Sequence, residues 1–238
     1  MHRYGGTVVA GARTRDLLLE QGALLFARHG VAGVTARQLH EAVGARNESA
    51  LHYHFGGKDG LALEILRRHL EAIEARRAQL VAAIVADRRE GDLRALVHAL
   101  AAPMADDLGT AVGRARLRLV AQFDHPSLAY SAPFRLTGAP AGAGVVRWLR
   151  EALAHLPEPI RVERLAALRE QLIELMGLRA QLLDEGPAEQ CRTSTEVFLQ
   201  NLVDMLVAGL GAEPSADTLA ALDGGDPAEG APAPRPAT

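Results

Sequence analysis

Cysteine is almost absent from this sequence, and that shortage bears on where the protein works. Cys191 is the only cysteine among 238 residues, so no disulfide can form within the chain. A single thiol without an oxidised framework favours a reducing compartment, and we expect Cys191 to be a small hydrophobic residue in the interior. We therefore predict a cytoplasmic protein.

Long apolar runs are missing as well. No stretch of about 18 apolar residues occurs, which is the length that a membrane-spanning helix needs. The most apolar late segment, 198–210, is interrupted by Gln200, Asn201 and Asp204. The first residues also lack the charged and then apolar pattern of a secretion signal. We expect no membrane partner.

The familiar catalytic signatures are missing too. The sequence has no glycine-rich phosphate loop, no nucleophile elbow and no metal-ligand spacing. His52 and His54 are two residues apart and would point to different sides of a helix, whereas a zinc pair on a helix needs a spacing of four. We predict no catalytic residue, no metal and no cofactor, with a small all-α enzyme as the alternative reading.

Aromatic residues make up only 4% of the chain, while alanine, leucine and arginine fill long stretches. This composition favours helices over strands, and 48% hydrophobic content is enough to form a core. The formal net charge is −3, but residues 1–70 contain nine Lys/Arg against six Asp/Glu. An all-α protein with a small basic module on a larger acidic body is therefore predicted, a charge distribution typical of DNA-binding proteins.

Helical periodicity and glycine or proline breakers divide the chain into segments. Residues 1–12 are rich in glycine without periodicity, so we predict a flexible arm there. Thr35 and Gln38 have the spacing of a capping box, and Asn47 and Asp92 are good N-caps. Helices are expected over 13–29, 35–43, 47–55, 58–84, 92–108, 110–123, 144–156, 159–183 and 193–210. The predicted domains are a helix-turn-helix domain at 13–60, a helical ligand-binding and dimerisation domain at 61–211, and a largely disordered tail at 212–238 with a possible helical turn at 217–222.

Two short helices joined by a glycine-containing turn can place the second helix in the major groove of DNA. Here the run 44–61, Gly-Ala-Arg-Asn-Glu-Ser-Ala-Leu-His-Tyr-His-Phe-Gly-Gly-Lys-Asp-Gly-Leu, closely resembles the recognition-helix signature of TetR-type (tetracycline-repressor-like) regulators. The similarity covers about residues 13–66, and upstream it includes Leu25-Phe26, Gly30 and Leu39. Gln21-Gly22, His40 and one extra residue after Gly44 depart from the family pattern.

The resemblance implies a ligand-released repressor that binds a near-palindromic double-stranded DNA operator as a homodimer. A helix-turn-helix adaptor that binds protein is a further alternative. Backbone N–H groups at the start of the second helix can bind phosphate, small and polar side chains of the third can read base edges, and Lys58, the only lysine, is expected to bind phosphate. The predicted DNA-binding residues are Thr35, Ala36, Arg37, Arg46, Asn47, Glu48, Ser49, Ala50, His52, Tyr53, His54 and Lys58.

The C-terminal helices carry apolar stripes with steps of three and four residues, a spacing that suits helix bundles. The last long helix is apolar nearly all round, which requires burial on two sides. The resemblance implies a four-helix bundle between two subunits, and the alternative is that both stripes lie within one monomeric bundle. The predicted dimer interface is Leu168, Leu172, Leu175, Arg179, Phe198, Leu202 and Leu206.

The family fold further implies an effector pocket within residues 92–182. A small, largely apolar molecule of unknown identity is the expected effector, with Arg116 or His98 as possible polar contacts. The predicted lining residues are Met104, Phe123, Phe134, Trp148 and Met176.

Overall fold

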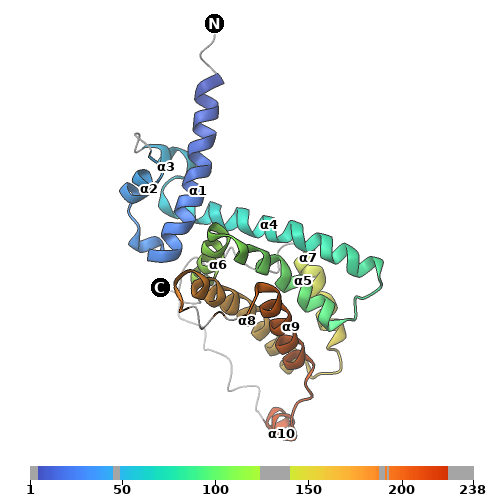
Figure 1. The fold of residues 1–238 in the computed structure, drawn as a ribbon. Helices are drawn as coiled ribbons and strands as arrows, with labels where there is room; N and C mark the ends of the chain where they lie inside the picture. Colours follow the sequence, from blue (N-terminus) through green and yellow to red (C-terminus); the bar gives the residue numbers. More distant parts are fainter. Residues whose placement is uncertain (1–4, 45–48, 124–139, 188–190, 192, 225–238) are drawn as a thin grey trace, which may run out of the picture.

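The structure is a computed structural model that describes residues 5–44, 49–123, 140–187, 191 and 193–224. Over these ranges the chain is helical apart from turns, and the all-α prediction is confirmed (Figure 1). Within them, no helix combines the length and the apolar character needed to cross a membrane. The elements are α1 (Gly5–Gly33), α2 (Ala36–Ala42), α3 (Ser49–Phe55), α4 (Lys58–Ala86), α5 (Leu93–Ala105), η1 (Asp106–Gly109), α6 (Ala111–Phe123), α7 (Pro140–Ala152), α8 (Glu158–Glu185), α9 (Thr195–Gly211) and α10 (Ala216–Gly224).

Helix α1 differs from its prediction at the start and agrees with it near the end. It begins at Gly5 rather than Arg13, so the backbone of residues 5–12 is helical where we predicted a flexible arm. The glycines of residues 5–12 do not interrupt the helix, because helix formation extends towards the N-terminus from the well-packed turns that follow. Gly30 interrupts the helix with a φ of 69°, which glycine adopts without strain. The expected helix break therefore lies at Gly30, with one more turn after it.

The N-terminal helices surround a core of their own. Phe26 of α1, Leu39 of α2 and Leu51 of α3 are buried together. The same core contains Leu61 and Ile65 of α4, and α6 adds further buried residues to it. The three N-terminal helices therefore pack directly on two helices of the larger body, at one end of α4 (Figure 1).

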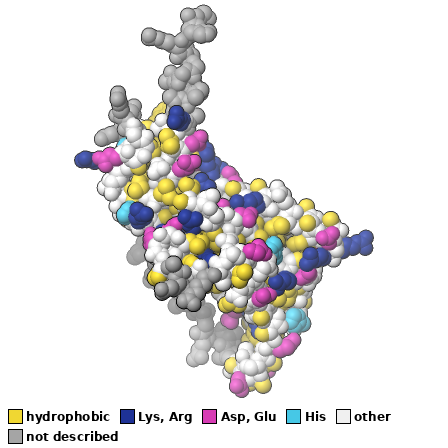
Figure 2. Space-filling model, viewed as in Figure 1, with side chains coloured by type: hydrophobic (Ala, Val, Ile, Leu, Met, Phe, Trp, Pro, Cys, Tyr) yellow, Lys and Arg dark blue, Asp and Glu magenta, His cyan; other side chains and the backbone are white. Residues whose placement is uncertain are grey.

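The larger core lies along the second half of α4. Ile73 and Ile84 of α4 pack there with buried residues from α5, α7, α8 and α9. Helix α5 lies against both α4 and α9, and α6 packs along α8. On the face drawn in Figure 2, basic and acidic side chains are interspersed, with hydrophobic atoms between them. The two cores meet where α4 passes from one to the other.

Several helix boundaries are set by caps that the sequence indicates. Asp92 accepts a hydrogen bond from the Ala95 backbone N–H, so α5 begins at the predicted residue. Ser194 caps α9 by accepting from the Val197 N–H. Helix α7 begins at Pro140 rather than Gly144, because proline is accepted in the first turn of a helix. Helix α10, at the predicted helical turn, has no buried residue.

A buried histidine joins α4 to η1. His69 is 1% exposed, and its Nδ1 lies 3.4 Å from Oδ2 of Asp107. Asp107 accepts hydrogen bonds from Arg76 at 3.2 and 3.0 Å, whereas neither ring nitrogen of His69 has a hydrogen-bond partner among the described residues. Burial lowers the pKa of His69 to about 4, and the cations Arg116 and Arg76 act in the same direction while Asp107 opposes them. His69 is therefore neutral in the folded protein at neutral pH.

We expect acid to destabilise the fold through His69. Its pKa is about 4 in the folded chain against 6.5 in the unfolded chain, so between these values the unfolded state binds more protons. The free energy of unfolding should fall as the pH drops through this window, by about 3 kcal/mol at most. Urea titrations of wild type and His69→Gln at about pH 7 and about pH 4.5 test this. An equal pH dependence in both proteins would show that His69 is not the group responsible.

Candidate nucleic-acid interface

Helix α2 is built around the predicted capping box. Thr35 Oγ1 accepts a hydrogen bond from the Gln38 N–H at 3.3 Å, and Gln38 Oε1 accepts from the Thr35 N–H at 2.8 Å. The helix buries Leu39 and His40 and leaves Thr35, Ala36 and Arg37 exposed. The Arg37 side chain is 83% exposed and pairs with Glu41 at 2.7 Å. Three predicted phosphate-binding residues thus lie together on an exposed end of α2.

Helix α3 has one buried and one open side. Leu51 is 3% exposed, and Phe55, one turn later, packs under the Arg15 guanidinium, which lies 5.6 Å from the ring centre. Tyr53 points away from this side and is 84% exposed, and His52 is also exposed. His54 is half-buried, with its ring 5.1 Å from that of Tyr53. A helix whose outer side chains are exposed in this way, among the described residues, can enter a groove of DNA.

The segment before α3 carries several predicted contacts. Arg46, Asn47 and Glu48 lie outside the residues that the structure describes. The backbone of Ser49 starts α3, and Ala50 beside it is half-buried. The structure therefore places α3, and the contacts expected from residues 46–48 stay predictions.

A tight turn connects α3 to α4, and glycine is required there. Gly56 and Gly57 have φ values of 72° and 128°, which side chains rarely allow. At Gly60 an added Cβ would lie 1.8 Å from the carbonyl oxygen of Phe55. The turn sets α4 directly behind α3, and this close approach explains the glycine at the fourth position of the Gly-Lys-Asp-Gly segment.

Lys58 binds backbone carbonyl groups of the chain itself, which the predicted phosphate contact did not include. Its Nζ donates hydrogen bonds to the carbonyl oxygens of Ala32 and Val34, each at 3.2 Å. These carbonyls belong to the end of α1 and the residue before the α2 cap. An ammonium group has three N–H donors, so one remains for a phosphate. The structure gives Lys58 a role in joining α4 to α1 and α2 that the sequence analysis missed.

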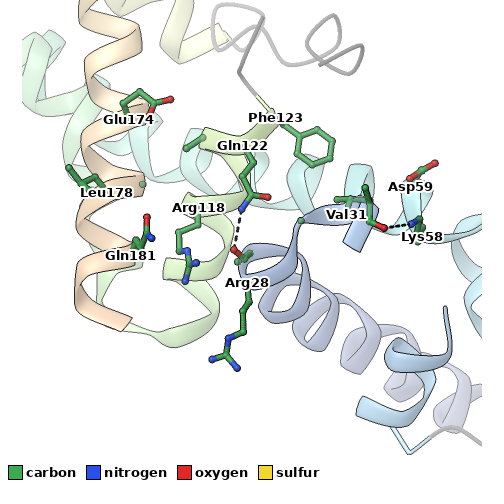
Figure 3. Close-up of a pocket in the computed structure, with 15 residues that line it drawn as sticks. Arg28, Val31, Lys58, Asp59, Arg118, Gln122, Phe123, Glu174, Leu178 and Gln181 are labelled. Atoms are coloured by element: carbon green, nitrogen blue, oxygen red, sulfur yellow. Dashed lines mark hydrogen bonds between the residues drawn. The ribbon is translucent and has the colours of Figure 1, made fainter. Parts of the chain in front are cut away.

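A groove lies between the end of α1 and the start of α4 on one side and α6 and α8 on the other (Figure 3). Its volume is about 920 Å³, and its walls come from the end of α1, the start of α4, α6 and α8. Gln122 of α6 reaches across it and donates to the Ala27 carbonyl at 3.1 Å. Phe123, a predicted effector contact, lines this groove.

The predicted effector-lining residues do not surround one cavity. Met104 lines a separate cavity of about 220 Å³ between α4, α5, α7 and α8, while Phe123 lines the groove. Met176 is fully buried in the core, Trp148 is half-buried beside Arg147, and Phe134 lies outside the described residues. Spacing along a helix identifies core residues, but which of them border an opening depends on how the helices meet.

The small cavity contains a charged residue that the sequence analysis missed. Arg77 of α4 is 4% exposed and lines it. A signal was available, because Arg77 occupies the position between Ile73 and Leu80 in the apolar stripe of α4. A charge within such a stripe is a candidate buried polar contact.

The predicted dimer residues lie mostly inside the chain's own core. Leu202 and Leu206 are 2% and 4% exposed, and Leu168 and Leu172 are equally buried. Arg179 is also buried; it donates to the Thr193 carbonyl at 2.5 Å and lies 5.0 Å from the Phe198 ring centre. Only Leu175 and Phe198 are half-exposed. In the single chain these apolar stripes are part of one helix bundle, which is the alternative given above.

Other apolar residues of α8 and α9 are exposed instead. Leu178 is 50% exposed, Val197 52% and Met205 58%. Val197 and Met205 are eight residues apart on α9, so they share one side of the helix. Both faces of α9 carry apolar residues, and only packing decides which of them the chain's own core covers.

We expect Lys58→Ala to destabilise the protein in the absence of DNA. The substitution removes two hydrogen bonds from a charged donor, each worth about 1–3 kcal/mol. Thermal unfolding of the free protein should therefore occur at a lower temperature. Arg37→Ala is the matched control, because its side chain is 83% exposed and its i,i+4 pair is worth about 0.3–0.5 kcal/mol. If both variants melted like the wild type, Lys58 would have no such joining role.

Comparison with known proteins agrees with this geometry. Residues 18–65 match the family model described as "Bacterial regulatory proteins, tetR family". The chain is also similar to the HTH-type transcriptional repressor AcnR of Corynebacterium glutamicum, with 39% identity over 64 residues. That alignment covers 26% of this chain and 34% of AcnR, so the similarity spans about a third of the relative's length. The matched residues run from α1 into α4.

Proposed function

Because residues 18–65 match the model of bacterial regulatory proteins of the tetR family, we propose that the whole protein is a cytoplasmic, DNA-binding transcriptional repressor of that type and not an enzyme. The observation that carries the proposal is the α2–α3 pair, which buries Leu39 and Leu51 and leaves Arg37, His52 and Tyr53 exposed. A recognition helix anchored from behind and open in front suits the major groove.

The proposed contacts divide by chemistry. Thr35, Ala36 and Arg37 lie at the exposed start of α2 and are suited to phosphate, as is the remaining N–H of Lys58. Ala50 and His52 of α3 are suited to base edges, and Tyr53 and His54 to the backbone beside them. Arg46, Asn47, Glu48 and Ser49 stay in the proposal as the residues that enter the groove first.

Two copies are proposed to assemble through the exposed face of α8 and α9. Val197 and Met205 of α9 and Leu178 of α8 are large apolar side chains that the described residues leave at least half exposed. Burying them against a second copy would remove this surface from water. A two-fold dimer presents two recognition helices and therefore requires a near-palindromic operator, with half-sites one helical turn or a multiple apart.

Release by a small molecule is proposed to act through α4. This helix begins at Lys58, which holds the end of α1, and continues into the core of the body. A molecule that binds the body and displaces α4 would change the separation of the two recognition helices. Its coupling to DNA would be reciprocal, so that operator weakens the molecule's binding by the same factor.

An electrophoretic mobility shift with DNA from upstream of the protein's own gene tests the DNA-binding function directly. We expect a shifted band with that fragment and its loss on addition of unlabelled competitor. Failure to bind any fragment of a random double-stranded library at low salt would reject the repressor and leave the protein-binding adaptor.

Substitutions in α2 and α3 should distinguish residues that contact the DNA phosphates from residues that contact the bases. Arg37→Ala removes a candidate phosphate contact, so binding to all sequences should weaken equally and the salt slope should decrease by about 1. His52→Ala should instead change the preference among operator bases, by about 1–3 kcal/mol for the base that it contacts. Selection from a randomised operator library, repeated for each variant, measures both effects. Equal changes in base preference for the two variants would contradict the assignment.

Charge on the proposed dimer face should yield monomers. Met205→Glu and Val197→Glu place carboxylates where two apolar surfaces would meet, so sedimentation should show the single-chain mass and operator binding should be lost with it. Leu222→Glu on α10 is the matched control, an exposed leucine outside the proposed face. A dimer that survives both substitutions in α9 would place the interface elsewhere.

A further inference from the structure

The 220 Å³ cavity in the body has apolar walls and one deeply buried cation. Arg77 of α4 and the partly exposed Arg169 of α8 are the charged residues that line it. Most of the wall is made by hydrophobic side chains from α5, α7 and α8. They include Leu100, Met104, Val146, Leu165, Leu168 and Leu172.

Arg77 is held from one side only. Its Nη1 donates to Oε2 of Glu74 at 2.7 Å. Among the residues that the structure describes, its buried Nε has no hydrogen-bond partner. Burial lowers the pKa of Arg77, and Glu74 opposes this effect. A buried N–H without an acceptor is unfavourable, so this edge of the guanidinium is suited to an acceptor from outside the chain.

Glu74 also binds the first turn of α7, in addition to Arg77. Its Oε1 accepts hydrogen bonds from the backbone N–H groups of Ala141 and Gly142, at 2.5 and 3.0 Å. These are the first N–H groups of α7, and Gly142 itself lines the cavity. Arg77, Glu74 and the start of α7 therefore form one chain of contacts that ties α4 to α7.

From these observations we propose that the cavity binds a small, mainly apolar carboxylate, with its carboxylate on the Arg77 guanidinium and its apolar part against Leu100, Met104 and Leu168. A guanidinium edge binds a carboxylate through two parallel hydrogen bonds. The regulatory consequence rests on the proposed function, while the binding itself does not.

The size of the cavity limits the ligand. A dry apolar cavity of about 150 Å³ accommodates benzene, so 220 Å³ suits one aromatic ring with a carboxylate and one or two further atoms. Benzoate and phenylacetate are the probes of this size. Benzamide and phenylacetamide are their matched neutral counterparts, with the same shape and no charge.

Binding of the carboxylate would affect the contact between α4 and α7. A second anion at Arg77 competes with Glu74 for the same guanidinium and repels its carboxylate. The hydrogen bonds that Glu74 accepts from the Ala141 and Gly142 N–H groups then weaken. As a result, α4 can shift against α7. Because α4 begins at Lys58 beside the DNA-facing helices, the carboxylate should lower operator affinity, by the 5- to 150-fold that is typical of such coupling.

Calorimetric titration of the full chain without DNA tests the site itself. We expect the two carboxylates to bind at least about tenfold more tightly than their amides, as an added charged hydrogen bond implies. Arg77→Met should abolish this difference, and Val146→Phe, which fills the cavity, should abolish binding of all four probes. Arg76→Gln is the control: it neutralises the neighbouring arginine, which pairs with Asp107 outside the cavity, and should keep the preference.

Several results would overturn the proposal. Equal binding of acid and amide by the wild type would do so, as would an undiminished preference in Arg77→Met. If Arg77→Met failed to fold, as judged by circular dichroism, the wild-type comparison and Val146→Phe would still decide. Carboxylate binding without operator binding would support this site and reject the proposed function, whereas operator binding without carboxylate binding would do the reverse.

Discussion

The whole arrangement depends on one continuous helix that takes part in two hydrophobic cores. Helix α4 has 29 residues, a length of about 43 Å at the usual rise per residue. Its first turns bury Leu61 and Ile65 among the DNA-facing helices, and its later turns bury Ile73 and Ile84 in the body. Packed interiors resist small displacements. A shift of one end of α4 is therefore transmitted to the other end, and the hydrogen bonds of Lys58 bring that motion to α1 and α2.

Buried charges determine how the body is attached to this helix. His69 lies two turns before the adjacent Arg76 and Arg77 on α4, and each of the three lies close to a carboxylate, Asp107 or Glu74. Asp107 of η1 lies beside His69 and pairs with Arg76. Glu74 accepts hydrogen bonds from Arg77 and from the start of α7, and so connects the two. Buried polar groups must be paired, and breaking one pair leaves its partner uncompensated. The two hydrogen bonds that Glu74 accepts therefore fix the first turn of α7 against α4.

An apolar stripe on a helix predicts burial, but it does not say whether the same chain or a second copy covers it. Leu168, Leu172, Leu202 and Leu206 have the spacing that a helix bundle requires, and they do form one, within a single chain. Val197 and Met205 lie on another side of α9 with the same apolar chemistry, yet they are exposed. A helix that is apolar nearly all round needs two partners. Its sequence does not say which side meets the chain's own core.

The sequence by itself determined the local features of this protein. The Thr35–Gln38 capping box, the break at Gly30, the Gly56-Gly57 turn and the Asp92 cap depend on residues close together in the chain, and the anchoring role of Leu39 and Leu51 follows from helical spacing. Tertiary structure alone decided that Lys58 reaches the carbonyls of Ala32 and Val34, that Arg77 faces a cavity and that Met104 and Phe123 do not share one. Caps and turns act over three or four residues, whereas those contacts join helices far apart in the sequence, and their geometry is fixed only when the two cores pack around α4.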